Sequence, residues 1–309
     1  MKRIVALFMV MMMVASFMAT AVMAEHISGD YEYNVLSDGT ASLTGYYPNQ
    51  ESFDLVVPEM LDGIKVKEIA DYAFQRNKKI ESVDIPDTVE KIGKGAFEYC
   101  ENLKTVHIGM GINDIDNSTF SHCIQLSNVE LPDSITRIGE SAFESCEQLY
   151  SIDFPSNLEA LENHAFDVSG LEVVDLSSTK INTTGFGTFN CCNNLKKVII
   201  GGNITEIGDY SFYACNNLEE VEIDSPLQRI GLANFAMSKI KTFEIPNTVT
   251  DIGDIAFESC SELDIFLPET ITNFGGSSIC RNVKHITAPE GSVAAHYCAK
   301  YGLDFDYSD

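Results

Sequence analysis

The sequence predicts one right-handed, β-rich repeat solenoid of about ten coils, each 22–23 residues long. Two observations predict this fold. A phenylalanine that follows a small or polar residue recurs at a spacing of 23 residues, seven times in succession, and then of 22. Aliphatic residues accompany it at fixed offsets. Because one unit cannot bury its own apolar face, the units must stack, which replaces the two globular domains that 309 residues would otherwise suggest.

The repeated phenylalanines form a column that we expect in the core. The column comprises Phe74, Phe97, Phe120, Phe143, Phe166, Phe189, Phe212, Phe235 and Phe257. A tenth, degenerate copy places Ile279 at the same point. An aliphatic residue lies eight positions before each phenylalanine, and an Ile-Gly pair often begins five positions before it, as in Ile92-Gly93. We expect the phenylalanine ring to pack between coils and the glycine to supply a turn conformation.

A short strand is expected after each phenylalanine. Leu103, Val106 and Ile108 are typical, because the leucine lies six residues after its phenylalanine and the other two alternate with polar residues. This alternation indicates a strand with Val106 and Ile108 inward. Proline often follows and ends the strand, since it cannot donate to a ladder. In the copy after Phe166 the strand comes one residue early, and one extra residue before Phe189 restores the spacing.

Residues 1–24 have the pattern of a secretory signal peptide. Lys2 and Arg3 precede an apolar run that small residues close, with cleavage favoured after Ala24 or, as second choice, Ala21. The alternative is an uncleaved membrane anchor. No later run approaches the ~18 apolar residues that span a bilayer. We therefore expect a secreted or cell-surface protein with no transmembrane segment after cleavage and no anchoring signal in this chain.

The composition is strongly acidic. The chain has 20 Lys plus Arg against 46 Asp plus Glu, a net charge of −26, and removal of Lys2 and Arg3 with the leader gives 18 − 46 = −28. Such a chain would repel nucleic acid, so a protein that binds phosphate backbones is excluded. Tryptophan is absent, which disfavours the usual aromatic site for sugar stacking.

The combined pattern L-x-x-V-x-I-P-x-x-V-x-x-I-G-x-x-A-F-x-x-C resembles the BspA-type leucine-rich repeats of exported bacterial proteins. The resemblance covers residues 64–288 and implies a leucine-rich-repeat solenoid with an adhesion or other protein-binding role outside the cell, without a particular ligand. The flanks also look like that family. Residues 25–63 contain a hairpin that would cover the first coil, and residues 289–309 contain a short capping helix, stopped by Gly302, and a tail.

Nine cysteines leave at least one thiol unpaired in a monomer. Six of them share one column, three residues after the phenylalanine: Cys100, Cys123, Cys146, Cys192, Cys215 and Cys260. Neighbours in this column would have parallel Cβ atoms about 5 Å apart, beyond the roughly 3.5–4.5 Å of a disulfide, so we expect buried thiols. A bridge between Cys280 and Cys298 remains open. The adjacent pair Cys191-Cys192 lacks the C-x-x-C spacing of structural zinc, and no metal site is expected.

One column of the strands should point to solvent, ten residues after each phenylalanine. It contains Asp84, His107, Glu130, Asp153, Asp175, Ile199, Glu222 and Glu244, and the coils of Asp175 and Glu244 are one residue short. Like charges on neighbouring strands repel by about 1 kcal/mol per pair in water. Two interpretations remain: a solvated face that keeps the rod soluble, or a face for a basic protein or for weakly bound divalent cations. Tyr150, beside Asp153, is a candidate aromatic anchor.

The sequence contains no recognisable catalytic constellation. Its six histidines are scattered, and none pairs with an acid and a nucleophile in a familiar arrangement. We therefore expect an exported, non-enzymatic adhesion or binding module that needs no cofactor and presents its acidic strand face to an extracellular or host-surface protein. The alternatives are a structural or self-associating cell-envelope component and a glycan-binding protein. The oligomeric state is open.

Overall fold

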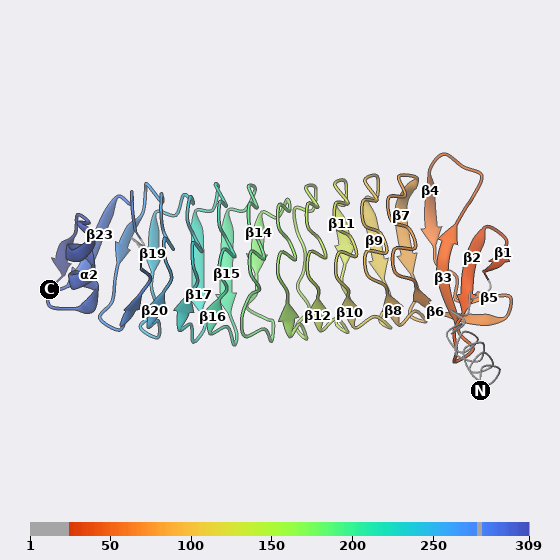
Figure 1. The fold of residues 1–309 in the computed structure, drawn as a ribbon, viewed down its shortest axis with the longest axis horizontal. Coiled ribbons are helices and arrows are strands. Elements are labelled where there is room, and N and C mark those ends of the chain that lie inside the picture. Colours follow the sequence, from red (N-terminus) through yellow and green to blue (C-terminus); the bar gives the residue numbers. More distant parts are fainter. Residues whose placement is uncertain (1–24, 277–279, 309) are drawn as a thin grey trace, which may run out of the picture.

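The computed structural model describes residues 25–276 and 280–308, so the predicted leader and the Ile279 copy lie outside the described residues. Figure 1 shows one elongated solenoid with a small sheet at its N-terminal end and the short helix α2 (Val293–Tyr301) at the other. The predicted β-rich solenoid is confirmed, with about 12 turns where the repeat indicated about ten coils.

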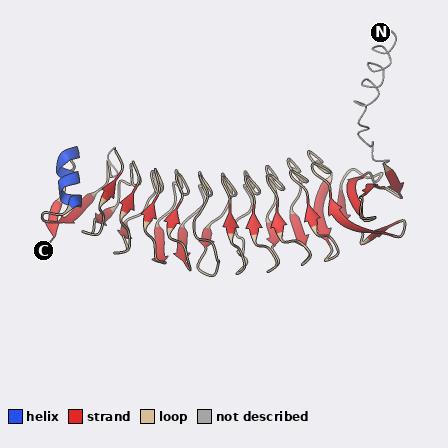
Figure 2. Cartoon of the chain, turned by 60° about the horizontal axis from the view of Figure 1, so that its bottom comes forward, coloured by secondary structure: helices blue, strands red, loops and turns tan. Residues whose placement is uncertain are grey.

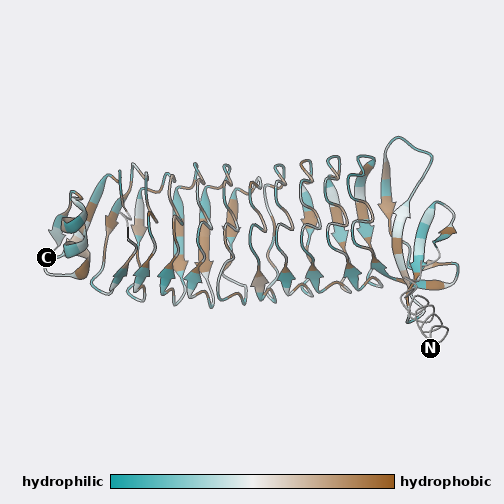
Figure 3. Ribbon diagram, in the orientation of Figure 1, coloured by the Kyte–Doolittle hydropathy of each residue, from teal (hydrophilic) through white to brown (hydrophobic). Residues whose placement is uncertain are grey.

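Most coils contribute one strand to a first row of parallel strands, the row predicted from the L-x-x-V-x-I pattern (Figure 2). Apolar and polar residues alternate along these strands (Figure 3), and the inward Val106 and Ile108 are each only 2% exposed. The first row consists of β4 (Phe53–Val56), β7 (Ile80–Ile85), β9 (Thr105–Ile108), β11 (Asn128–Glu130), β14 (Val173–Asp175), β15 (Lys197–Gly201), β17 (Glu220–Asp224), β19 (Thr242–Glu244), β21 (Asp264–Phe266), β23 (His285–Pro289) and β24 (Asp306–Ser308).

A second row of shorter strands carries the isoleucine that precedes the glycine. The isoleucines face the core and lie side by side in parallel register, as Ile207 and Ile230 do. The second row consists of β6 (Ile64–Ile69), β8 (Lys91–Ile92), β10 (Asp114–Ile115), β12 (Arg137–Ile138), β13 (Ala160–Leu161), β16 (Glu206–Ile207), β18 (Arg229–Ile230), β20 (Asp251–Ile252) and β22 (Asn273–Phe274).

The glycine after this isoleucine serves close packing, and the expectation that it supplies a turn conformation was wrong. Gly93 and Gly253 do not have a positive φ. A Cβ atom on Gly93 would lie 2.5 Å from the backbone nitrogen of Asp71, and one on Gly253 would lie 2.5 Å from that of Leu232. The missing side chain therefore lets the backbones of successive coils approach each other.

The nine phenylalanine rings form a continuous stack in the core, from Phe74 to Phe257. No ring is more than 2% exposed. Successive ring centroids lie 5.1–5.7 Å apart with interplanar angles of 1–17°. Such parallel pairs contribute about 0.5–1.5 kcal/mol each beyond the burial of their surface. The stack links every coil that contributes a ring to its neighbours.

The chain on both sides of each phenylalanine adopts an unusual backbone conformation. Around Phe97, for example, Gly95 and Tyr99 have φ angles of 58° and 59°, and most residues at the equivalent positions are not glycine. A left-handed conformation costs about 1–2 kcal/mol per non-glycine residue. It is offset by hydrogen bonds between coils, such as the bond that the Tyr99 N–H donates to the Ser121 carbonyl at 2.8 Å. These turns thus make a third hydrogen-bonded row.

The six cysteines of the repeated column are free and buried, and each Sγ donates to a main-chain carbonyl of an earlier coil. Cys100, for example, donates to Phe74 at 3.1 Å. Serine replaces cysteine in some coils, and it also contacts the neighbouring side chain of the column: the Ser169 Oγ lies 3.2 Å from the Cys192 Sγ. Burial raises the pKa of Cys192 to about 12, so this thiol is a neutral donor at ordinary pH. The thiols at Cys280 and Cys298 are also free and buried.

Both predicted caps are present. At the N-terminal end, β1 (His26–Ser28), β2 (Tyr31–Val35) and β3 (Ala41–Tyr46) form an antiparallel sheet, β3 runs parallel to β6, and β5 (Met60–Leu61) pairs with β6. At the other end, the Ser292 side chain accepts the Ala295 N–H at the start of α2, and Gly302 stops the helix with a φ of 64°. The caps cover the ends of the stacked coils.

Candidate functional site

The outward column follows the first row of strands, with one residue on each coil, and all its members except Asp153 lie on strands of that row. Pairing of β7, β9 and β11 places Asp84, His107 and Glu130 side by side. Pairing of β14, β15 and β17 does the same for Asp175, Ile199 and Glu222. All members of this column are exposed except Ile199, which is half-buried. We call the column the acidic strand face, and it consists of Asp84, His107, Glu130, Asp153, Asp175, Ile199, Glu222 and Glu244.

Two of the acidic side chains have a basic side chain close by within the chain. The His107 Nδ1 lies 3.4 Å from a carboxylate oxygen of Glu130. The Lys197 Nζ lies 2.6 Å from the Glu222 Oε1, and this hydrogen bond raises the pKa of Lys197. Lys197 therefore offsets locally part of the repulsion expected along the acidic strand face.

The remaining carboxylates of the face differ in their surroundings. Asp175 accepts hydrogen bonds from the backbone N–H of Ser177 at 2.9 Å and from its hydroxyl at 2.6 Å, so it also stabilises a turn. In the described part of the chain, Asp84, Asp153 and Glu244 have neither an ion pair nor a side-chain hydrogen bond. These three carboxylates are available to a ligand.

The first row of strands is interrupted twice, between β11 and β14 and between β17 and β19. The interruption after β11 corrects the expectation that Asp153 lies on a strand. Residues 151–154 lie outside any strand, so Asp153 is exposed on an irregular segment and not on a strand. Phe154 occupies the position that is isoleucine in regular coils. Its ring lies edge-on to the core rings, 5.5 Å from Phe166 and 6.3 Å from Phe189 between centroids. The loss of the regular strand here thus coincides with a core position that holds an extra aromatic ring.

The second break separates β17 from β19. These two strands are not paired in the described structure, although β17 pairs with β15 on one side and β19 with β21 on the other. The coils meet again at both ends of the break. Lys239 donates its N–H to the Leu218 carbonyl at 2.9 Å, and Thr250 donates its N–H to the Gln228 carbonyl, also at 2.9 Å. The break is therefore an opening closed at both ends, with a volume of about 560 Å³.

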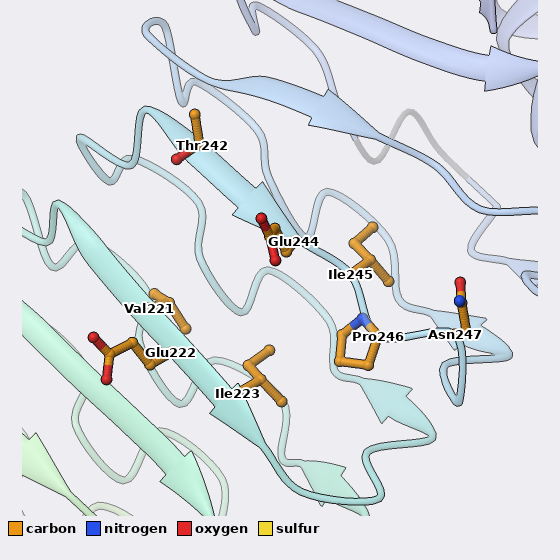
Figure 4. A pocket seen from close by; sticks show the side chains of 8 residues that line it. All are labelled: Val221, Glu222, Ile223, Thr242, Glu244, Ile245, Pro246 and Asn247. Atoms are coloured by element: carbon orange, nitrogen blue, oxygen red, sulfur yellow. The ribbon is translucent and has the colours of Figure 1, made fainter. Parts of the chain in front are cut away.

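Figure 4 shows the apolar side chains of Ile223, Ile245 and Pro246 beside this opening and Glu244 on its β19 side, whereas the Glu222 carboxylate lies on the side of β17 away from β19. Val221 and Ile223 are half-buried, whereas their counterparts in β15, Val198 and Ile200, are 0% and 1% exposed. We call the opening the β17–β19 slit, and its lining consists of Val221, Glu222, Ile223, Thr242, Glu244, Ile245, Pro246 and Asn247.

Both breaks occur where a full-length coil is followed by a coil whose strand begins one residue early. At the slit, Phe243 occupies the inward position that is valine in most coils. Its ring lies 5.1 Å from the ring of Phe235 and 5.0 Å from that of Phe257. The second break thus coincides with a shortened coil and with an inward side chain larger than valine. The short coils were visible in the sequence, but the opening beside them was not predicted.

Tyr150, the candidate anchor, is 43% exposed, and its hydroxyl donates to the Gln148 side chain at 2.6 Å. It borders a hollow of about 280 Å³ that Val168 and the half-buried Cys191 also line. Tyr150 thus lies beside the first break of the acidic strand face.

A cluster of aromatic residues elsewhere was missed by the sequence analysis. The exposed Phe186 lies between two rings, with centroid distances of 5.3 Å to His164 and 5.2 Å to Tyr210, and Tyr210 lies 5.5 Å from Tyr213. Phe186 falls outside the repeated columns, so no periodic signal marked it. The cluster lies by the phenylalanine turns and not on the acidic strand face.

Within residues 25–276 and 280–308, no three His, Cys, Asp or Glu side chains gather in a group that could hold a metal ion. None of the helices described there has the length and apolar character needed to cross a membrane.

Comparisons with known proteins agree with this architecture. Among solved structures, a leucine-rich repeat protein from Bacteroides ovatus ATCC 8483 has a TM-score of 0.74 at 24% identity, covering 92% of this chain and 78% of that chain. The T. pallidum leucine-rich repeat protein has a TM-score of 0.50 at 20% identity, covering 91% and 98%. No curated protein matches the sequence. The family model described as "BspA type Leucine rich repeat region (6 copies)" matches residues 67–187 and 182–297. Since this match spans most of the chain, the protein belongs to the BspA-type leucine-rich repeat family.

Proposed function

We propose that the chain is an exported, non-enzymatic binding module whose acidic strand face receives a basic surface of an extracellular or host-surface protein. One observation carries the proposal. The paired strands hold acidic side chains in register on a rigid surface, and carboxylates such as Asp84 and Glu244 have no cation of their own in the described structure. A partner that supplies lysine or arginine would satisfy them.

Two properties of the chain support this role. Solenoids offer extended surfaces that suit large partners, and here the surface is held by three rows of hydrogen bonds and by the phenylalanine stack. The net charge of −26 would also steer a basic protein toward the chain and speed association at low salt. Both properties favour a protein partner over a small substrate.

Salt dependence tests the proposal. The purified chain, immobilised, should capture basic proteins from an extract of surface proteins at low ionic strength. The capture should weaken strongly as the ionic strength rises to ~0.5 M, because screening shortens the range of the attraction. Capture of polysaccharide alone, insensitive to salt, would show that the proposal is wrong.

Substitutions locate the binding face. Asp153→Asn combined with Asp175→Asn should weaken capture while the melting temperature stays the same or rises, since like charges are removed and the asparagine oxygen at position 175 can still accept the hydrogen bonds from Ser177. A matched control, Glu140→Gln with Glu159→Gln, makes the same change in net charge at exposed positions off the face. Equal loss of capture in both double variants would mean that the face itself has no special role.

A further inference from the structure

We propose that an aromatic cluster on the phenylalanine turns binds a neutral saccharide, whose ring stacks on Phe186 and whose hydroxyls bond to the polar groups of the neighbouring rings. We call it the Phe186 cluster, and it consists of His164, Phe186, Tyr210 and Tyr213. The inference goes beyond the proposed function, because the cluster does not lie on the acidic strand face. Three features support it: an exposed ring that departs from the repeat, free polar groups on the rings around it, and carboxylates that already have partners.

Phe186 is an aromatic residue at a position that is polar in the coils beside it. It lies three residues before Phe189 of the core column, and the equivalent residues of the two neighbouring coils are Asn163 and Asp209. The Phe186 side chain is 45% exposed, so packing of the core does not account for its presence. A single exposed apolar residue is ordinary, but this one belongs to a group of rings in mutual contact, which is typical of a binding surface.

The rings of the Phe186 cluster are tilted against one another and do not form a closed stack. The interplanar angles are 61° between His164 and Phe186, 47° between Phe186 and Tyr210, and 69° between Tyr210 and Tyr213. In the core column, by contrast, neighbouring rings are within 17° of parallel and cover each other's faces. The tilt leaves ring surface exposed in the cluster. Because the face of an aromatic ring is electron-rich, it attracts the C–H groups on one face of a sugar ring.

The other rings of the cluster carry polar groups that a ligand can use. Among the described residues, the hydroxyls of Tyr210 and Tyr213 make no hydrogen bond. The His164 Nδ1 lies 3.0 Å from the Asp167 Oδ2, and Asp167 also accepts a hydrogen bond from the Asn190 side chain at 2.9 Å. These contacts hold the imidazole in place and leave its Nε2 free. Two hydroxyls and one imidazole nitrogen beside an exposed apolar ring suit a saccharide, which has hydroxyls around an apolar face.

The charges beside the cluster favour a neutral ligand. Asp167 is hydrogen-bonded to His164, and Asp209 pairs with the Arg229 guanidinium at 2.9 Å. These carboxylates therefore have partners within the chain, unlike Asp84 of the acidic strand face, and do not need a cation from a ligand. Nucleic acid bases also stack on aromatic rings, but the net charge of −26 repels their phosphates. A neutral sugar ring is the stacking ligand that meets neither obstacle.

Affinity electrophoresis of the full chain in native gels tests the inference. Each gel contains one neutral polysaccharide (laminarin, arabinoxylan, galactomannan or glycogen) or the anionic polygalacturonate. At least one neutral polysaccharide should retard the chain, and polygalacturonate should not, because its carboxylates are repelled. Retardation by none of the neutral polysaccharides, or by polygalacturonate alone, would overturn the inference.

Loss of the exposed ring should have the largest effect on retardation. Phe186→Ala should raise the polysaccharide concentration that gives half-maximal retardation about tenfold, because the stacking surface is removed. Phe266→Ala is the matched control: Phe266, on β21, is also 45% exposed but has no ring contact in the described structure. This control should leave retardation unchanged. Equal weakening by the two substitutions would overturn the Phe186 cluster as the site.

The hydroxyl groups are tested separately from the rings. Tyr210→Phe keeps the ring and removes the hydroxyl, and it should weaken retardation about fivefold. Tyr99→Phe is the control, since Tyr99 lies outside the cluster and stacks on His122 with 4.4 Å between ring centroids. Because both changes keep the ring, they leave packing intact, and retardation unaffected by Tyr210→Phe would contradict the role given to this hydroxyl.

The same variants separate this inference from the proposed function. Asp153→Asn with Asp175→Asn should leave retardation by polysaccharide unchanged, and Phe186→Ala should leave the capture of basic proteins unchanged. Loss of retardation in the aspartate double variant would place the saccharide on the acidic strand face and overturn the inference. Either proposal can therefore fail while the other stands.

Discussion

The part of the first row from β4 to β11 and the part from β15 to β19 are built from the same repeat but behave differently. From β4 to β11 the strands are paired without a gap, and inward residues such as Val83 and Ile85 are 2% and 0% exposed. From β17 to β19 the pairing stops and the equivalent Val221 and Ile223 are half-buried. The phenylalanine stack passes through both parts unchanged.

This difference shows that pairing within the first row is not the only contact that keeps successive coils aligned. At the slit, the coils stay aligned through the stacked rings, the second row and the turns. In the second row, β18 still pairs with β20, with Arg229 opposite Asp251 in the strand register. The Phe235 N–H still donates to the Ala256 carbonyl at 2.8 Å. Since these contacts hold the coils, the first row is free to open locally without loss of the fold.

The largest expected effect tests whether the ring stack is equally important in both parts. Phe97→Ala, between β7 and β9, and Phe235→Ala, beside the slit, should each lower the free energy of unfolding by about 3–5 kcal/mol, because both rings are fully buried. Urea denaturation followed by circular dichroism measures this loss. A much smaller cost for Phe235→Ala would mean that the stack does not compensate for the missing strand pairing.

The glycine contacts of the second row should cost less to disturb. Gly93→Ala and Gly253→Ala each place a Cβ atom 2.5 Å from a backbone nitrogen, and each should destabilise the chain by about 1–3 kcal/mol. Gly276→Ala is the control, since the nearest atom to its added Cβ lies at 3.9 Å. If Gly93→Ala were as mild as Gly276→Ala in thermal melts, close approach of the backbones would not be what the repeat requires of this glycine.

Alkaline pH tests the buried thiols. Burial raises the pKa of Cys100 from its usual 9.0 to about 12. The fold therefore favours the neutral thiol, and this stabilisation is complete below pH 9 and is lost as the pH rises from 9 toward 12. The melting temperature should fall more steeply above pH 9 for the parent chain than for Cys100→Ser, which has no thiol to ionise at this position. Parallel curves for the two proteins would contradict the assignment.

The smallest expected effect concerns local opening and leaves global stability unchanged. Amide hydrogen exchange at Val221 should be faster than at Val106 by on the order of 100-fold, because only the latter lies between two paired strands. Nuclear magnetic resonance would resolve the two amides. Equal protection would show that β17 and β19 pair in solution, and the slit would then be closed.

The sequence predicted those features that repeat in every coil. The period of the phenylalanines placed the rings in the core, and the alternation around Val106 and Ile108 placed the first row. It did not predict why glycine recurs after isoleucine, since the constraint on Gly93 comes from the backbone of another coil. Contacts of this kind depend on how closely the coils pack, which the residue pattern alone does not specify.

The candidate site was harder to derive because it depends on departures from the repeat. The outward acidic column followed directly from the period of two. The slit, by contrast, coincides with a shortened coil and with Phe243 at a valine position. Each was visible in the sequence, but the separation of two strands is a balance between core volume and ladder hydrogen bonds, and the sequence shows neither quantity.

The short coils have a consequence for how such a protein could acquire new specificity. Where a coil has one residue fewer before its strand and one larger core side chain, two neighbouring strands are separated while the coils beyond them remain stacked. A surface opening can then arise without a new loop or an added domain. The same small change at another coil would move the opening along the rod, so that descendants of one ancestral array could address different targets with an unchanged scaffold.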